Sequence, residues 1–331
     1  MVVSAPGSGL GAPGRSGRIA LWIAGTLALT LAFWTMGLAG LLAIAGHHHV
    51  DIPAALAARL PLLRSQPKLI FAGESRTECG VDPELAAAIL NEPPGFAVNI
   101  AYEAGEPLAY AAAARRFPDT FRQAHVVLSV APFIFNEGVG QASVYPLDVI
   151  AHLSLGQQLT TFLPLRVGTL IRYIREAFAA RLAQDQDVAR QGPLLPRGGL
   201  GVLDRVGQGR PNLGQHPYYA HWDLSGPKTR LAVEAMCEIA SASAHLTVVD
   251  PPWFPEDRGN DAEWNRYEGE LMSVLRDAGR RCGFDVLRIE TVPMLEAADF
   301  ADEMHVNPRG IPVYTRYLIA RLGLTHRQAK Q

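Results

Sequence analysis

Five short apolar runs, spread over most of the chain, constrain its fold more than any other feature. They are Lys68–Ala72, Phe96–Ala101, His125–Val130, His245–Val249 and Phe284–Ile289. Helical patterns accompany them at Leu108–Arg116, Glu263–Cys282 and Thr315–Leu322, and a further helix is expected after Asp82, its N-cap, with Pro83 in the first turn. Short apolar strands that alternate with helices are typical of a parallel sheet covered on both faces. The sequence therefore predicts a three-layer α/β/α fold around a parallel five-stranded sheet.

The alternation is interrupted between about 133 and 230. This stretch holds one helical run, Gly168–Ala183, and then a Gly- and Pro-rich section from Gln191 to Gly226. Because it is too long for an ordinary loop, we expect an insertion over the strand ends, which serves as a lid or as a partner-docking surface. Its aromatic cluster would either stack on sugar rings or form the small core of the lid, and the core interpretation is favoured. The cluster consists of Tyr218, Tyr219 and Trp222 with His216 and His221.

An uncharged apolar segment runs from Ile19 to Ala45. It is longer than the roughly 20 residues that a helix needs to cross the hydrocarbon core of a bilayer. Arg15 and Arg18 directly precede it, so the positive-inside rule predicts a cytoplasmic N-terminus and an exported domain. The alternative is a cleaved signal peptide, for which Ala43–Ala45 resembles a cleavage site, but the apolar run is much longer than the roughly 7–15 residues of a signal-peptide hydrophobic region. Either interpretation exports the domain.

The chain is thus expected to have four parts. Residues 1–18 form a disordered cytoplasmic tail, 19–46 a transmembrane helix, 47–66 a tether, and 67–325 the α/β domain with its insertion. The predicted location is the inner (cytoplasmic) membrane, in a single pass, with the domain on the periplasmic or extracytoplasmic side.

Charge and cysteine content exclude several classes of function. The net charge is −2, without the basic patch of a nucleic-acid-binding protein. The three cysteines, Cys79, Cys237 and Cys282, lack metal-site spacing, and their odd number leaves at least one unpaired, so no disulfide framework is expected. The run His47–His49 has no cysteine partner nearby, and we predict neither a metal nor a cofactor.

Two motifs at opposite ends of the predicted domain carry residues suited to acyl chemistry. In the first, Leu69–Arg76, an apolar run ends at Gly73 and places Ser75 just after a strand, where ligands bind in parallel sheets. In the second, Asp302 precedes His305 by three residues, so its carboxylate can reach the Nδ1–H of the ring and leave Nε2 to face the serine. Together they predict a nucleophile (Ser75), a base (His305) and an orienting carboxylate (Asp302).

Such a site needs hydrogen-bond donors for the developing oxyanion. The candidates are the backbone N–H of Ser75, the backbone of Gly105 after the second strand, and the side-chain amide of Asn136 after the third. A structural role for Asn136 at the start of the insertion is equally compatible with the sequence. Asn99 is expected to end its strand by bonding the local backbone.

These motifs resemble the SGNH (GDSL-type) hydrolase superfamily, over about 68–322 with the insertion unmatched. Gly73–Arg76 is similar to the first block of the family and Asp302–His305 to its last, which implies Ser75, His305 and Asp302 as the triad. Gly105 corresponds to the glycine of the second block. The chain departs from the family twice: Glu74 replaces the usual Asp, and the Gly-x-Asn-Asp context of the third block is absent around Asn136.

The resemblance implies an SGNH/flavodoxin-like sheet and a serine esterase or O-acyltransferase. It is strongest to the membrane-anchored branch that includes alginate O-acetylation and D-alanyl-lipoteichoic acid synthesis proteins. That branch implies transfer of an acyl group to an envelope or extracellular polysaccharide, beside a multi-span membrane O-acyltransferase as partner. The alternative is a catalytically silent SGNH-like scaffold in an envelope polymer assembly. Metal-assisted hydrolysis lacks a ligand cluster in the sequence.

Overall fold

The structure is a computed structural model that describes residues 22–30, 32–33, 36–37, 54–103, 105–137, 198–199, 222–254, 262–289 and 292–324. The chain divides into two compact units, Met1–His48 and His49–Gln331, and each is described by itself.

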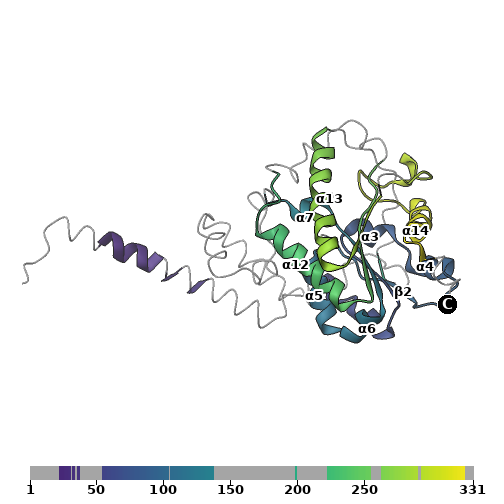
Figure 1. Ribbon diagram of the computed structural model, residues 1–331, viewed down its shortest axis with the longest axis horizontal. Helices are drawn as coiled ribbons and strands as arrows, with labels where there is room; N and C mark the ends of the chain where they lie inside the picture. The colour runs from purple at the N-terminus through teal and green to yellow at the C-terminus, as the bar shows by residue number, and fades with distance from the viewer. Residues whose placement is uncertain are drawn as a thin grey trace, which may run out of the picture. The chain divides into compact units, whose positions relative to one another are not determined.

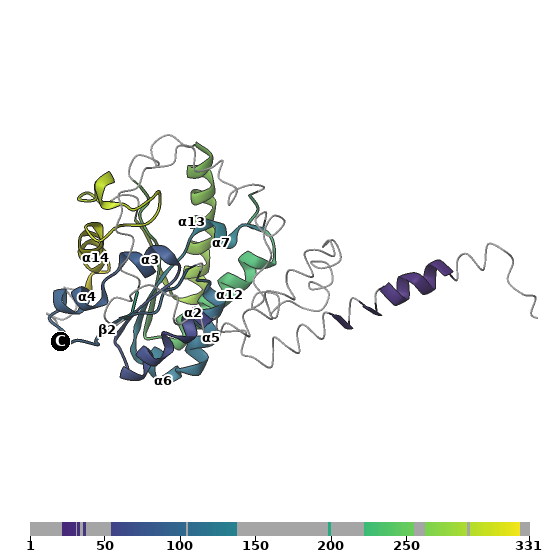
Figure 2. The same cartoon turned by 180° about the vertical axis from the view of Figure 1, so that it is seen from behind.

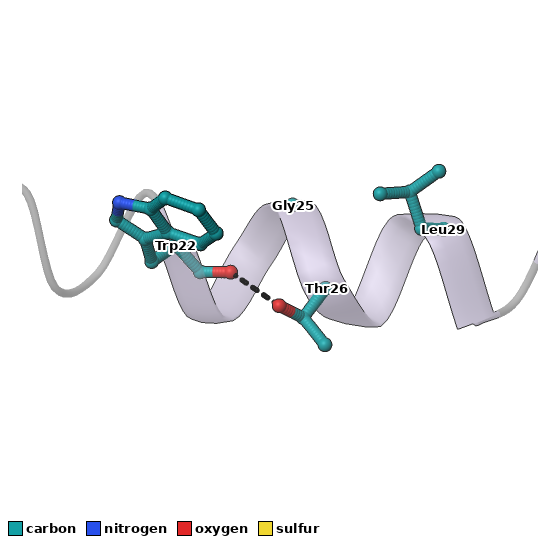
Figure 3. Close-up of a pocket in the computed structure, with 4 residues that line it drawn as sticks. All are labelled: Trp22, Gly25, Thr26 and Leu29. Carbon is teal, nitrogen blue, oxygen red and sulfur yellow. Dashed lines mark hydrogen bonds between the residues drawn. The ribbon is translucent and has the colours of Figure 1, made fainter.

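The described part of the first unit is helical and exposes its apolar side chains. Thr26 Oγ1 donates to the carbonyl of Trp22 at 2.9 Å, on the helix surface lined by Trp22, Gly25, Thr26 and Leu29 (Figure 3). In the ranges given above, no helix has both the length and the apolarity to cross a bilayer. Much of the predicted span Ile19–Ala45 lies outside the described residues, as do Arg15, Arg18 and His47–His49, and the span stays a prediction.

The second unit is built on a five-stranded parallel sheet with the order β2-β1-β3-β4-β5. Its strands are β1 (Leu69–Ala72), β2 (Ala97–Asn99), β3 (His125–Ser129), β4 (His245–Asp250) and β5 (Asp285–Arg288). The registers pair Leu69 with Ala97 on one side and with His125 on the other, and His125 with His245. The order changes direction between β1 and β3, which is where ligands bind in sheets of this topology.

Helices cover both faces of the sheet (Figures 1 and 2). On one face α5, α12 and α13 pack over Ile70, Val126 and Leu246; on the other, α4 and α14 pack over Phe71 and Val127. The helices are α2 (Ala54–Ala57), η1 (Leu60–Ser65), α3 (Ser75–Gly80), α4 (Pro83–Ile89), α5 (Pro107–Arg116), α6 (Pro118–Gln123), α7 (Pro132–Phe135), α12 (Pro227–Ala242), α13 (Ala262–Cys282), η5 (Ala297–Asp299) and α14 (Gly310–Arg321). Successive strand residues thus face different cores, which explains the near-continuous apolar runs in the sequence.

The predicted three-layer α/β/α fold and its five strands are confirmed. The predicted N-cap is also present: the Asp82 carboxylate accepts hydrogen bonds from the backbone N–H groups of Glu84 and Leu85, with Pro83 first in α4. Several helices were not predicted, among them α3, α6, α7 and α12. α12 begins at Pro227, where the sequence had been assigned to the insertion, and its alanine-rich composition gives a weak apolar pattern.

Most of the predicted insertion at 133–230 lies outside the described residues, including Gly168–Ala183 and the residues His216, Tyr218, Tyr219 and His221. Trp222 is described. Its ring stacks on Tyr267 of α13 at 4.7 Å between centroids, and the two belong to a packed aromatic cluster. The segment predicted as a tether contributes Leu56, Leu60 and Leu63 to the main core.

The expectation of no disulfide framework was wrong. Cys237 of α12 and Cys282 at the end of α13 form a disulfide, with their Cα atoms 5.1 Å apart. The two helices pack side by side on the same face of the sheet, and their sequence separation of 45 residues gave no sign of this. Cys79 is the free, buried cysteine.

Candidate active site

The turn after β1 places Ser75 at the carboxyl edge of the sheet. Gly73 has φ +125°, and a Cβ at this position would lie 2.1 Å from Ser129 Oγ and 2.5 Å from the Ser129 carbonyl oxygen. Only glycine fits this conformation and this approach to β3. Glu74 then acts as the N-cap of α3, because its carboxylate accepts from the backbone N–H of Arg76 at 2.9 Å. Ser75 is consequently the first residue of α3 and lies at the switch point between β1 and β3.

The loop between η5 and α14 presents the imidazole. Asp302 Oδ1 accepts from the backbone N–H groups of Met304 at 3.0 Å and His305 at 2.9 Å, which closes a tight turn. The base of this turn is held by an antiparallel bridge between Phe300 and Val306. Asn307 Oδ1 accepts from the N–H of Gly310 at 3.3 Å at the start of α14.

The structure brings Ser75, His305 and Asp302 together. The Nε2 atom of His305 lies 2.8 Å from Ser75 Oγ, and its Nδ1 atom lies 2.8 and 3.0 Å from the two carboxylate oxygens of Asp302. The side chains of His305 and Asp302 are 16% and 22% exposed, so the site is open enough to be reached and dry enough to strengthen these contacts. With Nδ1–H donated to Asp302, Nε2 is the acceptor that a serine hydroxyl requires.

Asp302 is held in its ionised form. Burial opposes its charge, but the hydrogen bond from His305, the attraction of that ring and the two backbone N–H donors outweigh burial and lower the pKa of Asp302 to about 2. The carboxylate is therefore charged throughout the neutral range and fixes the orientation of the imidazole.

The three predicted oxyanion donors differ in their contacts. In the part of the chain that the structure describes, the backbone N–H of Ser75 at the start of α3 donates no hydrogen bond. Gly105 packs against the turn, since a Cβ there would lie 2.1 Å from the Gly73 carbonyl oxygen, but its N–H already donates to the Tyr102 carbonyl at 2.9 Å. Asn136 is buried, and its side-chain oxygen accepts from the N–H of Asp223 at 3.0 Å. The Asn136 side chain thus joins the two edges of the insertion.

Sequence reasoning missed a buried charged network directly beside the serine. Arg76 is 2% exposed, and its guanidinium contacts Glu74, Asp250 and the carbonyls of Val130 and Pro251. Its position next to Ser75 was visible in the motif, but an arginine is usually a surface residue and no pattern signals its burial.

A second buried ion pair lies further along α3. Arg59, which precedes η1, donates to Glu78, and both side chains are almost fully buried. Burial raises the pKa of Glu78 to about 7, and the opposing attraction of Arg59 only partly offsets it. Asn99 bonds the local backbone as expected, with its Oδ1 accepting from the N–H of Ala101 at 3.0 Å. Within the described ranges, no group of three or more His, Cys, Asp or Glu residues could hold a metal ion.

Comparisons with known proteins give a limited result. No family model matches the chain, and no curated protein matches it. Among solved structures the chain is similar to LAE5, an alpha/beta hydrolase enzyme from the metagenome of Lake Arreo, Spain, at 13% identity and a TM-score of 0.38, covering 78% of this chain and 96% of that one. It is also similar to a catalytic mutant of Axe2, an acetylxylan esterase from Geobacillus stearothermophilus, at 12% identity and a TM-score of 0.38, covering 78% and 94%. At this score neither likeness bears on what this chain does.

Proposed function

We propose that this protein is a serine esterase or O-acyltransferase with Ser75, His305 and Asp302 as its triad. The observation that carries the proposal is the continuous hydrogen-bonded line from Ser75 Oγ through both ring nitrogens of His305 to the Asp302 carboxylate. The resemblance of the two motifs to SGNH hydrolases supports the same assignment, with the chain order serine, aspartate, histidine. A serine hydroxyl becomes a useful nucleophile when a neighbouring base takes its proton, and this arrangement supplies the base and its orienter.

The proposed reaction has two halves. Ser75 Oγ attacks an ester or thioester carbonyl while His305 Nε2 takes the hydroxyl proton, and the backbone N–H of Ser75 donates to the oxyanion. His305 returns that proton to the leaving group as the acyl-enzyme forms. The ring then takes a proton from the acceptor, which attacks the acyl carbon. His305 passes this proton to Ser75 Oγ as the acyl–serine bond breaks and the acylated acceptor leaves. Water as acceptor makes the protein an esterase, and a sugar hydroxyl makes it a transferase.

We further propose that the domain works outside the cytoplasm, anchored by its N-terminal segment and acting on an envelope polysaccharide beside a multi-span O-acyltransferase. Two observations support export. Arg15 and Arg18 precede the uncharged segment, and the Cys237–Cys282 disulfide is of a kind that persists in oxidising compartments. The substrate and the partner come from the family resemblance.

Labelling of the full-length protein in detergent with a fluorophosphonate probe tests the proposed function. We expect the wild type to be labelled, and Ser75→Ala and His305→Ala to lose labelling while they remain folded. His245→Ala is the matched control, because His245 also lies 3.0 Å from a carboxylate, that of Asp285, at a solvent-exposed pair without a serine. Absence of labelling in folded wild type would contradict the proposal and favour the silent scaffold.

The acceptor is identified in a second assay. The protein is incubated with a radiolabelled acetyl ester, with and without an oligosaccharide acceptor, and free acetate and acetylated sugar are measured. Label on the sugar that disappears in Ser75→Ala identifies a transferase, whereas release of free acetate alone identifies an esterase.

A further inference from the structure

The guanidinium of Arg76 donates hydrogen bonds to residues that lie just after the ends of three strands. Its Nη2 donates to the carbonyl of Val130 after β3 at 2.8 Å, and its Nη1 donates to the carbonyl of Pro251 after β4 at 3.1 Å. Its Nε donates to the carboxylate of Glu74 after β1 at 2.9 Å. Since the side chain is 2% exposed, these bonds form in a dry environment where each is strong.

Two carboxylates balance the charge of Arg76. Glu74 uses one oxygen for Nε and the other for the backbone N–H of Arg76, and Asp250 lies 3.4 Å from Nη1. One carboxylate therefore caps α3 and anchors the guanidinium at the same time, across the residue that carries the reactive hydroxyl. The glutamate at position 74, where the resembled family has aspartate, has the reach to bond both groups.

The network also extends toward the loop of the base. The guanidinium carbon of Arg76 lies 4.6 Å from the ring centroid of Trp253. The residue after this tryptophan, Phe254, donates its N–H to the carbonyl of Glu303 at 3.0 Å, inside the turn that connects Asp302 to His305. One segment after β4 is thus in contact with the neighbour of the serine and with the loop of the imidazole.

We propose that Arg76 is a positioning residue that holds Ser75 Oγ at its distance from His305. This inference rests on the proposed function. The planar guanidinium donates in several fixed directions at once, whereas a lysine ammonium is a single flexible point charge. Replacement by lysine keeps the charge but cannot satisfy Glu74, Val130 and Pro251 together, so the turn is released and the hydroxyl moves relative to the ring.

Kinetics on a short activated ester provide the first test. For Arg76→Lys we expect kcat to fall on the order of 10- to 100-fold at nearly constant KM, because small misplacements of reacting groups have effects of this size. Arg115→Lys is the matched control. Arg115 also joins two elements, through bonds of 2.7 Å to both carboxylate oxygens of Glu238, but on the exposed surface, and its kcat should stay within about twofold. All rates are compared at temperatures at which circular dichroism shows each variant fully folded.

A second readout does not depend on esterase activity. In a Ser75→Cys background, the alkylation rate of the introduced thiol by iodoacetamide reports its thiolate fraction beside His305. The native Cys79 does not interfere, since burial, with neighbouring carboxylates adding to it, raises its pKa to about 12. We expect alkylation near neutral pH that is reduced by His305→Ala, and a shift of its pH profile to higher pH when Arg76→Lys or Glu74→Gln is added.

The outcomes separate the two proposals. If the wild type has no esterase activity but Arg76→Lys shifts the pH profile of alkylation in the Ser75→Cys background, the proposed function is refuted and the positioning role of Arg76 stands. If Arg76→Lys does not fold, Glu74→Gln tests the same role. It removes the negative charge that pairs with the Arg76 guanidinium and keeps a side-chain oxygen that can cap α3. Folded variants with unchanged kcat and an unchanged alkylation profile would overturn the role of Arg76.

Discussion

At the scale of the residue, the site depends on two glycines, Gly73 and Gly105, that pack so closely against neighbouring atoms that no Cβ would fit. Gly73 lies against Ser129, and Gly105 lies against the Gly73 carbonyl, so three consecutive strand ends meet within van der Waals contact at the serine turn. The sequence showed that the first apolar run ends at Gly73. It did not show that Ser129 lies against this glycine, because a close approach between β1 and β3 depends on strand order, which a single sequence does not state.

The carboxylate of Asp302 supports a prediction about pH. Its pKa is lowered from 3.8 to about 2 in the folded protein, so it stabilises the fold above about pH 4, and this contribution is lost as the pH falls toward 2. In Asp302→Asn the contribution is absent. We therefore expect the urea midpoint of the wild type to fall more steeply than that of Asp302→Asn between about pH 4 and pH 2.

Asp302→Asn should also slow labelling of Ser75 by a fluorophosphonate on the order of 10²- to 10⁴-fold at neutral pH, because the amide no longer holds His305 in the required tautomer. If the urea midpoints of the wild type and of Asp302→Asn fall in parallel between about pH 4 and pH 2, the assigned charge of Asp302 is contradicted. Labelling within a few fold of wild type would contradict its role as orienter.

At the scale of the element, α3 is a short helix that is buried on nearly every side and carries charges inward. Glu74, Arg76 and Glu78 all belong to it or to its cap, and Arg59 reaches it from the segment before η1. Charged residues in a six-residue stretch would ordinarily indicate a solvated surface. The charges therefore hide the burial of this helix, which the sequence analysis did not predict.

Glu78 gives α3 a pH dependence of opposite sign. Burial raises its pKa from 4.5 to about 7, so the folded state binds a proton that the unfolded state has released in this interval. Stability from this group is full below about pH 4.5 and declines as the pH rises toward 7. The groups that act on it are Arg59, Glu103, His305 and Glu74.

We expect Glu78→Gln to remove this decline. Thermal unfolding of both proteins between pH 4.5 and 7.5 checks it, and the quantity to compare is the difference in Tm between variant and wild type. That difference should shift in favour of the variant as the pH rises. A constant difference across the interval would show that Glu78 is ionised throughout, as a pair with Arg59.

At the scale of the whole molecule, the disulfide joins two helices on one face of the sheet. Cys237 and Cys282 close a loop that includes β4, so the crosslink restricts the unfolded chain over a separation of 45 residues. Such crosslinks typically contribute about 2–4 kcal/mol, which corresponds to a Tm change of very roughly 5–10 °C in a domain of this size.

Reduction of the disulfide should therefore lower the Tm of the wild type by roughly 5–10 °C. Scanning calorimetry with and without a thiol reductant measures this change. The double variant Cys237→Ser/Cys282→Ser should have the lower Tm in both conditions and not respond to reductant. Cys79→Ser serves as the control and should retain the response. A wild type indifferent to reductant would contradict the crosslink.

The three layers of the fold could be predicted from the sequence, and so could Ser75, His305 and Asp302 as candidate site residues. Both predictions rest on strand periodicity and local spacing, which short contiguous segments of sequence contain. The sequence was insufficient for the pairing of Cys237 with Cys282 and for the burial of Arg76. Each of these depends on which distant elements become neighbours, and that information exists only once the sheet order is known.

The hydroxyl of Ser75 lies just after β1, and the imidazole of His305 lies in the loop before α14, 230 positions later. A ribosome therefore synthesises every element of the sheet before it adds the imidazole. Under the proposed function, a product that stops short of Asp302 carries the serine without the ring proposed to activate it, and we expect it to be inert toward esters.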